Sequence, residues 1–332
     1  MNKHIFRVAL VGCGVIAPNH LTALAELNET EVVALCDVRP ERAEQRRAEF
    51  APQARVYTDY LTMLDREKPD AVHIATPHYL HARMAIEALR RGIHVFLEKP
   101  LAVSEEEISA LLDEELRSGA RLCVCFQNRF NRSVAEAARI AAEDGGVVSA
   151  FAAVVWQRDE VYYRSGDWRG KKATEGGGVL INQAIHTIDL LCYFLGKPQK
   201  IEASVANHHL RGVIEVEDTA EARITFGDGR VACLYATTAF CGGDYTSLLL
   251  NTAHHAIEIR GSKLLVDDRL VLEENFDAIG KACYGSGHVK LIEAFYQALE
   301  KGEAAPVTAG SAQYALRTLL AAYRSLGETF DI

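Results

Sequence analysis

Strand-length apolar runs alternate with longer amphipathic stretches through the first part of the chain. Six apolar runs have the length and composition of strands: residues 6–11, 31–36, 55–57, 71–75, 94–97 and 122–126. The stretches that separate them predict helices over residues 15–27, 40–50, 80–91 and 104–117. Because strands that are apolar on both faces alternate with helices, residues 1–126 are expected to form a doubly wound parallel sheet.

The rhythm changes in the rest of the chain. Strand-like runs now follow one another, at residues 147–157, 200–206, 220–226, 230–238 and 256–259. Helices are expected over residues 133–142, 289–300 and 312–326. The sequence Gly227-Asp228-Gly229 predicts a hairpin between two of the runs. Residues 127–332 are therefore expected to form an α+β domain with a large open, mostly antiparallel sheet.

Composition narrows the class of protein. A length of 332 residues allows two domains, and the formal charge of −9 lacks the basic balance of a nucleic-acid-binding protein. The longest apolar runs are strand-sized, so no membrane association is expected. The N-terminus has no long apolar segment of the kind found in signal peptides, which favours a cytoplasmic location.

The eight cysteines give no sign of a metal or disulfide framework. They are scattered without a Cys-x-x-Cys pair, and several lie inside apolar runs: Cys36, Cys123, Cys192 and Cys233. We expect buried free thiols in a reducing compartment, and no bound metal.

A glycine-rich turn follows the first strand. Gly12 and Gly14, followed by Val15 and Ile16, fit the pattern G-x-G-x-x-[GA] at the junction between a strand and a helix. The first glycine permits the tight turn, and the second lets the backbone approach a pyrophosphate that also meets the amides at the helix N-terminus. The turn therefore predicts a dinucleotide-binding Rossmann domain.

Asp37 directly follows the second strand, where a carboxylate can accept hydrogen bonds from the adenosine ribose hydroxyls. A carboxylate there disfavours a 2′-phosphate, so NAD is expected rather than NADP. Arg39 lies two residues further on and can soften this preference by pairing with a phosphate.

Two polar groups are candidates for the chemistry. Lys99, in Glu98-Lys99-Pro100, follows a strand of the parallel sheet, at the edge where ligands of such sheets bind. A lysine beside a nicotinamide can accept a proton from an alcohol, although such a triplet is also common on solvated surface. Asn182 and His186 are one helical turn apart after a triple glycine. His186 is either a proton carrier or a core histidine bonded to Asp189.

Together these motifs resemble the Gfo/Idh/MocA family of NAD(P)-dependent oxidoreductases, over nearly the whole chain. The resemblance rests on five segments: the glycine-rich turn with His20, the run from Ala75 to His81, Glu98-Lys99-Pro100, Trp168-Arg169-Gly170, and Gly176 to Asp189. It implies a Rossmann domain followed by an α+β domain whose open sheet often builds dimers or tetramers. It also implies hydride transfer between a nicotinamide and a secondary alcohol or ketone of a sugar, sugar derivative or cyclitol.

The same resemblance assigns roles to residues. The proton-transfer residues would be Lys99 and His186, with Asn182 beside them. The cofactor would also be lined by Thr76, Pro77, His81, Glu98, Lys99, Gln127, Asn128, Trp168 and Arg169. The substrate would meet Lys99, Arg129, Tyr163, Asn182, His186 and His288. Aromatic faces with Arg and His donors, at residues 162–169 and 284–288, suit a polyhydroxylated ring, or equally serve to pack these loops.

Asn182 departs from the family pattern, because members such as inositol dehydrogenases often carry Asp there. An asparagine side chain takes no proton and makes no charge pair with a lysine, so the proton falls to Lys99 and His186. The chain is thus expected to be an NAD-dependent dehydrogenase that forms a homodimer or homotetramer. The alternatives are a non-catalytic NAD-binding sensor or regulator of the same fold, and a reductase of a dihydrodiol or non-sugar ketone.

Overall fold

A computed structural model of the chain describes residues 4–274, 287–325 and 329–332. The chain divides into two compact units. The first unit holds Met1–Gln127 and Ala278–Ala312, and the second holds Asn128–Asp277 and Gln313–Ile332.

The first unit is built on a six-stranded parallel sheet in the order β3-β2-β1-β4-β5-β6. This is the strand order of a Rossmann fold, as predicted. Its strands are β1 (Phe6–Val11), β2 (Thr30–Cys36), β3 (Arg55–Tyr57), β4 (Ala71–Ile74), β5 (His94–Leu97) and β6 (Leu122–Val124). The order reverses between β1 and β4, so the carboxyl ends of these two strands form the edge where such sheets bind ligands.

Helices of the first unit follow the predicted stretches closely. They are α1 (Ala17–Glu26), α2 (Pro40–Phe50), α3 (Tyr60–Glu67), α4 (His81–Leu89) and α5 (Glu105–Ser118), with a short turn η1 (His78–Leu80) before α4 and another, η2 (Gln127–Phe130), after β6. The predicted cap of α5 is present, since Ser104 Oγ accepts from the Glu107 amide. Helix α3 was not predicted.

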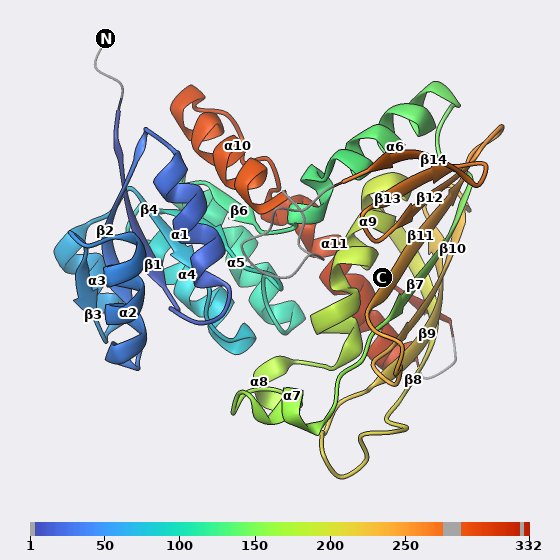
Figure 1. The fold of residues 1–332 in the computed structure, drawn as a ribbon, viewed down its shortest axis with the longest axis horizontal. Helices are drawn as coiled ribbons and strands as arrows, with labels where there is room; N and C mark the ends of the chain where they lie inside the picture. The colour runs from blue at the N-terminus through green and yellow to red at the C-terminus, as the bar shows by residue number, and fades with distance from the viewer. Residues whose placement is uncertain (1–3, 275–286, 326–328) are drawn as a thin grey trace. The chain divides into compact units, whose positions relative to one another are not determined.

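Helix α10 (Gly287–Lys301) belongs to the first unit, although the sequence assigned the whole of residues 127–332 to the second domain. Figure 1 shows α10, at the orange end of the colour scale, beside the blue α1. Tyr296 of α10 stacks near Phe6 and His73 of the parallel sheet. Burial of this aromatic ring explains why a late segment completes the early unit.

The second unit is built on a nine-stranded sheet in the order β14-β13-β12-β11-β7-β10-β9-β8-β15. Its strands are β7 (Ser149–Val155), β8 (Pro198–Ala206), β9 (Thr219–Phe226), β10 (Val231–Thr237), β11 (Tyr245–Asn251), β12 (Ala256–Arg260), β13 (Lys263–Val266), β14 (Arg269–Glu273) and β15 (Thr329–Asp331). Neighbouring strands are antiparallel except β7 and β10. The predicted hairpin joins β9 to β10, and Gly229 takes the positive φ that its turn requires.

The second unit also contains helical segments, some of which pack on this sheet. They are α6 (Arg132–Glu143), α7 (Glu160–Arg164), α8 (Lys172–Glu175), the π-helical segment η3 (Leu180–Ala184), α9 (Ile185–Leu195) and α11 (Ala309–Ser325), whose first residues belong to the first unit. Figure 1 shows α6 and α9 on the same side of the strands, where α9 packs on β7 and α6 on β12 and β13. The segment Lys172–Leu195 is long and apolar enough to cross a membrane by composition, but 83% of its most apolar window is buried inside the protein, as in a core helix.

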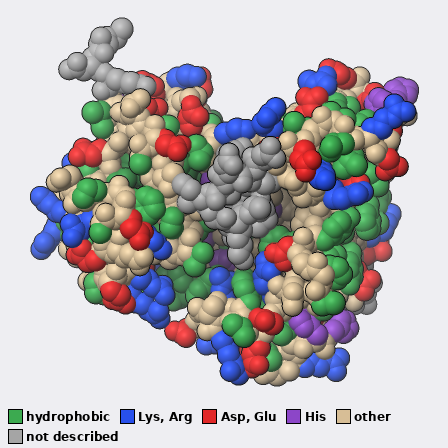
Figure 2. Space-filling model, in the orientation of Figure 1, with side chains coloured by type: hydrophobic (Ala, Val, Ile, Leu, Met, Phe, Trp, Pro, Cys, Tyr) green, Lys and Arg blue, Asp and Glu red, His purple; other side chains and the backbone are tan. Residues whose placement is uncertain are grey.

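The opposite face of the sheet carries exposed hydrophobic side chains, including Phe151, Tyr235 and Tyr245. Hydrophobic side chains gather over the strands at the right of the view in Figure 2. Cys233 lies on β10 two residues before Tyr235 and is also exposed, so its predicted burial was wrong. Successive residues of a strand point to opposite faces, which an apolar run alone does not reveal.

Candidate functional site

The glycine-rich turn has the geometry of a pyrophosphate cradle. Gly12 has φ +92°, and a Cβ there would lie 2.4 Å from the Ala75 carbonyl oxygen at the end of β4. A Cβ on Gly14 would meet no atom within 4 Å. The first glycine is therefore required by the protein, while the second borders open space. Val15 is 88% exposed, and no side chain caps α1 at Ile16, so the amides of its first turn are available to an anion.

Asp37 is held beside this turn. Its carboxylate accepts hydrogen bonds from the Cys13 amide at 2.8 Å and the Arg39 amide at 2.9 Å. Because a carboxylate can accept about four hydrogen bonds, it retains capacity for ribose hydroxyls. Together, the uncapped helix, the open space at Gly14 and the buried acid fit a dinucleotide.

The carboxyl ends of β4 and β5 are tied together by His81. Its ring nitrogens lie 2.7 Å from the Thr76 carbonyl oxygen and 2.6 Å from the Pro100 carbonyl oxygen. The peptide bond between Lys99 and Pro100 is cis. Glu98 is buried whereas Lys99 is partly exposed, so the two consecutive side chains point to opposite sides of the extended segment. Lys99 is thus presented at the ligand-binding edge of the sheet.

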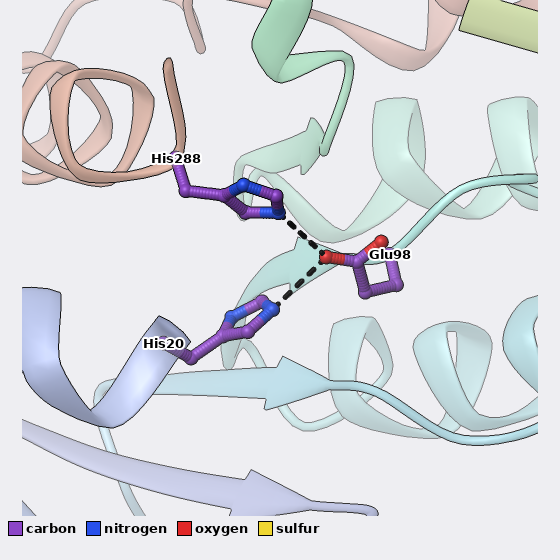
Figure 3. A group of neighbouring side chains, drawn as sticks. All are labelled: His20, Glu98 and His288. Atoms are coloured by element: carbon purple, nitrogen blue, oxygen red, sulfur yellow. Dashed lines mark hydrogen bonds and ion pairs between the residues drawn. The ribbon is translucent and has the colours of Figure 1, made fainter. Parts of the chain in front are cut away.

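Glu98 lies in a buried chain of polar side chains, and Figure 3 shows its contacts with His20 and His288. His20 of α1 and His288 of α10 both direct Nε2 at Glu98 Oε1, at 3.0 and 3.5 Å. The chain continues from His20 Nδ1 to His73 Nδ1 at 2.9 Å, and from His73 Nε2 to the Tyr296 hydroxyl at 2.9 Å. Five side chains, from β4, the segment after β5 and two helices, are therefore linked.

The charges in this chain are set by burial and partners. Burial raises the pKa of Glu98, but the His20 and His288 rings outweigh it and hold that pKa well below its usual range. Burial lowers the pKa of His73 well below its ordinary value. The ligand atoms of His20, Glu98 and His288 lie within 4.8 Å of one another, as in a metal site. Both rings can donate a hydrogen to the same carboxylate oxygen, so hydrogen bonding alone accounts for the cluster.

In the second unit, the helix that starts at Val179 carries the predicted Asn182 and His186. Between Ile181 and Leu190, these two residues are partly exposed and every other residue is buried. The segment η3 that contains Asn182 is π-helical rather than α-helical, a local widening that is frequent at functional sites. Four residues still make close to one full turn, so Asn182 and His186 share the accessible side of a core helix.

The triple glycine permits close packing at the start of this helix. A Cβ on Gly178 would lie 1.8 Å from the Glu217 carbonyl oxygen, and one on Gly177 would lie 2.0 Å from the Tyr323 hydroxyl. The Glu217 carboxylate accepts from the Gly178 amide at 2.9 Å, the Leu180 amide at 3.0 Å and the Tyr323 hydroxyl at 2.9 Å. A buried glutamate thus caps the helix that bears Asn182 and His186.

Glu217 makes stability depend on pH. Burial raises its pKa from 4.5 to about 7, although its hydrogen bonds oppose the shift. The protonated form is therefore favoured in the folded state, and this contribution is present below pH 4.5 and is lost as the pH rises through about 7. We expect Glu217→Gln to flatten the fall of the unfolding free energy between pH 5 and 8 by about 3 kcal/mol, as measured by urea unfolding. An unchanged pH slope would contradict this assignment.

Arg129 and Asp189 form an ion pair within the second unit. The Asp189 carboxylate accepts from Arg129 Nε at 2.8 Å and from Arg129 Nη2 at 2.6 Å. Burial raises the pKa of Asp189 to about 6, and Arg129 opposes the shift. The predicted ligand-binding Arg129 therefore has its guanidinium engaged by the aspartate that ends the family motif, and that ion pair links η2 to α9.

The two tyrosines of α7 have different surroundings. Tyr163, predicted to meet substrate, is buried among Leu210, Ile214 and Val216. Tyr162 instead places its hydroxyl 3.3 Å from Asn182 Nδ2 and 2.6 Å from Arg169 Nη1. Burial raises the pKa of Tyr162; the charge of Arg169 opposes this shift, and that of Glu175 adds to it. The structure thus brings Tyr162 to Asn182; the sequence placed both tyrosines in an aromatic loop suited to a ring but chose Tyr163 as the substrate contact.

Arg169 lies between two aromatic rings, with its guanidinium carbon 4.5 Å from the centre of Tyr162 and 4.6 Å from that of Trp168. Such stacking fixes a planar cation while leaving its edge able to bind an anion.

Glu175, at the end of α8, is fully buried and accepts a hydrogen bond from Asn182. Sequence reasoning missed Glu175, although an acid next to a triple glycine was visible.

The remaining predicted residues lie as follows. Gln127 is buried in the first unit, where the Cys125 thiol lies 3.8 Å from its Oε1. Asn128 Oδ1 in the second unit is buried and has no hydrogen-bond partner among the described residues. Pro77 precedes η1 at the carboxyl end of β4. His288 is buried, with Nε2 at 3.5 Å from Glu98 Oε1, rather than exposed, and residues 284–286 of the predicted glycine-rich loop lie outside the described residues.

Two family models match the chain. The model of an oxidoreductase family with an NAD-binding Rossmann fold matches residues 6–126, and that of the GFO/IDH/MocA C-terminal domain matches residues 137–266. The chain belongs to the Gfo/Idh/MocA family. Membership identifies the first unit as the NAD-binding domain of an oxidoreductase, in agreement with the cradle at Gly12 and Gly14.

Relatives of this Gfo/Idh/MocA protein include several dehydrogenases. D-glucoside 3-dehydrogenase of Escherichia coli (strain K12) is 26% identical, over 99% of this chain and 97% of the relative. The WlbA dehydrogenase of Bordetella pertussis was solved in complex with NADH and UDP-GlcNAcA. It is 28% identical to this chain and matches its structure with a TM-score of 0.88, over 100% of this chain and 99% of that chain. Levoglucosan dehydrogenase in complex with NADH shares the fold, at 23% identity, a TM-score of 0.86 and 99% coverage of both chains.

Proposed function

We propose that this protein transfers a hydride between NAD(H) and a secondary alcohol or ketone of a sugar, sugar derivative or cyclitol. Bound NAD supplies C4 of the nicotinamide as the hydride acceptor or donor. Lys99 and His186 handle the proton of the substrate hydroxyl. The observation that carries this proposal is the pair Asn182 and His186, the two accessible polar residues on an otherwise buried stretch of helix.

Three features of the first unit support the cofactor half of the proposal. Gly14 leaves space for a pyrophosphate, Asp37 offers acceptors for ribose hydroxyls, and Lys99 lies at the carboxyl end of β5. The carboxylate of Asp37 would repel a 2′-phosphate, so we propose a preference for NAD over NADP. The amine of a lysine beside the hydride acceptor can take the proton of an alcohol as the hydride leaves its carbon.

The substrate class rests on the second unit and on the relatives. Tyr162, Asn182 and Arg169 present hydroxyl, amide and guanidinium groups, which suit a ring that carries several hydroxyls. The relatives named above act on or bind glucosides, levoglucosan and a nucleotide sugar. We therefore propose a carbohydrate-like ring, without a choice between free and substituted sugars.

The test is a panel assay. Wild-type protein with NAD⁺ is offered myo-inositol, levoglucosan, methyl β-D-glucopyranoside, D-xylose, UDP-GlcNAcA and a cyclic dihydrodiol, and NADH is followed at 340 nm. Turnover of at least one of the first five compounds is expected. Turnover of a cyclic dihydrodiol alone would move the protein to the class of non-sugar reductases. Binding of NADH with no turnover of any alcohol or ketone would favour a non-catalytic sensor.

We also propose that the uncovered face of the large sheet joins copies of the chain in a homodimer or homotetramer. Exposed Phe151, Tyr235 and Tyr245 support this assembly, because monomers rarely expose several large apolar side chains on one face. Light scattering of the purified protein measures the number of subunits, and a monomer would contradict the assembly.

Five described cysteines are buried and form no disulfide, which supports a reducing, cytoplasmic compartment.

A further inference from the structure

Glu175 is a fully buried carboxylate in direct contact with Asn182. It is the last residue of α8, and Gly176 then turns the chain with φ +85° toward the helix that bears Asn182. Glu175 Oε1 accepts a hydrogen bond from Asn182 Nδ2, and Oε2 accepts one from the Gly170 amide at 2.5 Å. Both carboxylate oxygens therefore accept from N–H donors, inside the protein.

This contact determines the orientation of the Asn182 amide. A carboxylate that accepts on both oxygens can face only the nitrogen end of an asparagine. The second Nδ2 hydrogen is directed at the Tyr162 hydroxyl, 3.3 Å away. With both hydrogens of Nδ2 directed inward, the carbonyl oxygen Oδ1 is on the opposite side of the amide.

Asn182 shares the accessible side of its helix with His186, the residue proposed to handle the substrate proton. Asn182 and His186 are both partly exposed, while the residues around them on the helix are buried. An oxygen at this place accepts hydrogen bonds and cannot donate them, so it suits a substrate hydroxyl. A nitrogen at the same place would instead suit a carbonyl or carboxylate.

We propose that Glu175 is a positioning residue for the dehydrogenase reaction, which turns Asn182 so that its Oδ1 accepts a hydrogen bond from a substrate hydroxyl beside His186. This inference rests on the proposed function and deepens it, because it requires a substrate with a hydroxyl donor next to the reacting group. It also explains why position 182 is an amide. An aspartate there would bring two carboxylates into contact, and like charges at that distance cannot both ionise.

Glu175→Gln changes the contact without changing its size. A glutamine has a single acceptor oxygen, so it cannot accept from both the Gly170 amide and Asn182. Continued acceptance from Gly170 leaves the glutamine nitrogen facing Asn182, and the Asn182 amide then rotates to present its nitrogen outward. We expect kcat/KM for the best panel compound to fall about 100-fold, mostly through kcat, while NADH affinity stays unchanged.

The double variant E175Q/N182D is the decisive comparison. An aspartate at position 182 accepts from the glutamine nitrogen and again presents an oxygen outward, so most of the lost kcat/KM should return. Glu215→Gln is the matched control, because Glu215 is exposed and accepts from the Lys172 amide at the other end of α8. It should keep wild-type turnover. Full activity of Glu175→Gln, or a double variant no better than the single one, would overturn the proposal.

A second measurement does not depend on turnover. With asparagine selectively labelled with ¹⁵N, the side-chain amide hydrogens of Asn182 should exchange slowly with solvent in the wild type and quickly in Glu175→Gln. Thermal unfolding of both proteins reports whether the fold is retained. Equal exchange in the two folded proteins would overturn the positioning role, even if no panel compound is oxidised. Slow exchange in the wild type with no turnover would instead count against the proposed function alone.

Discussion

Lys99→Ala is expected to lower kcat by about 1000-fold and to leave NADH binding within a factor of about three of the wild type. The side chain lies at the carboxyl end of β5 and is partly exposed, whereas its neighbour Glu98 points into the buried chain of histidines. Removal of the lysine therefore deletes a proton acceptor at the ligand edge while the buried side stays intact. NADH fluorescence titration measures binding, and absorbance at 340 nm measures turnover.

Two matched variants sharpen this test. Gly14→Val should do the reverse, since its side chain would fill the open space beside the turn: NADH affinity is expected to fall more than about tenfold, with an unchanged melting temperature. Lys301→Ala removes an exposed lysine at the end of α10 and should behave as the wild type. Wild-type turnover in Lys99→Ala would remove this residue from the chemistry.

Gly178→Ala is expected to destabilise the protein by at least about 4 kcal/mol, which lies among the large effects of single substitutions. The added Cβ would lie 1.8 Å from the Glu217 carbonyl oxygen, a backbone atom that cannot rotate away. That carbonyl accepts from the Val179 amide at 3.1 Å, and the Glu217 carboxylate caps the same helix. A shift of Glu217 would therefore break its hydrogen bonds to the start of the helix.

The readout for this variant combines stability and turnover. We expect the melting temperature to fall by about 10 °C. Any folded fraction should also lose turnover, because Asn182 and His186 belong to the displaced helix. Gly310→Ala is the matched control, since its Cβ would meet only the Thr308 hydroxyl at 3.7 Å and alanine favours a helix. A melting temperature within 2 °C of the wild type in Gly178→Ala, about 1 kcal/mol, would contradict the close-packing account.

Periodicity was enough to predict most of the first unit. Strands that are buried on both faces leave continuous apolar runs, and the order of strand, glycine turn, helix and acid is local in sequence. Helix α3 was missed because its two turns fall in a short gap between strands. The sequence did contain the features of a helix: the Asp59 carboxylate caps it by accepting from the Thr62 amide, and Met63 and Leu64 form part of its buried face.

The hydrophobic pattern of the sequence could not predict contacts between distant segments. Tyr162 and Tyr163 are adjacent and chemically identical, and only the fold decides that the first faces Asn182 and the second a cluster of aliphatic side chains. The assignment of α10 to the first unit depends on Tyr296 reaching His73, more than 200 positions away. The predicted Asn182 and His186 could be found because both lie on one helix.

The buried chain from Tyr296 to Glu98 has a consequence for biosynthesis. A ribosome releases the strands of the nucleotide-binding sheet first, but two of the five linked side chains, His288 and Tyr296, emerge only near the end of translation. Until then Glu98 lacks its contact with His288 and His73 lacks its contact with Tyr296, and the surface of α1 that α10 covers stays exposed. The dinucleotide-binding unit therefore matures only after strands β7 to β14 of the second unit have been synthesised, and a fragment that stops at Gln127 would be an incomplete nucleotide binder.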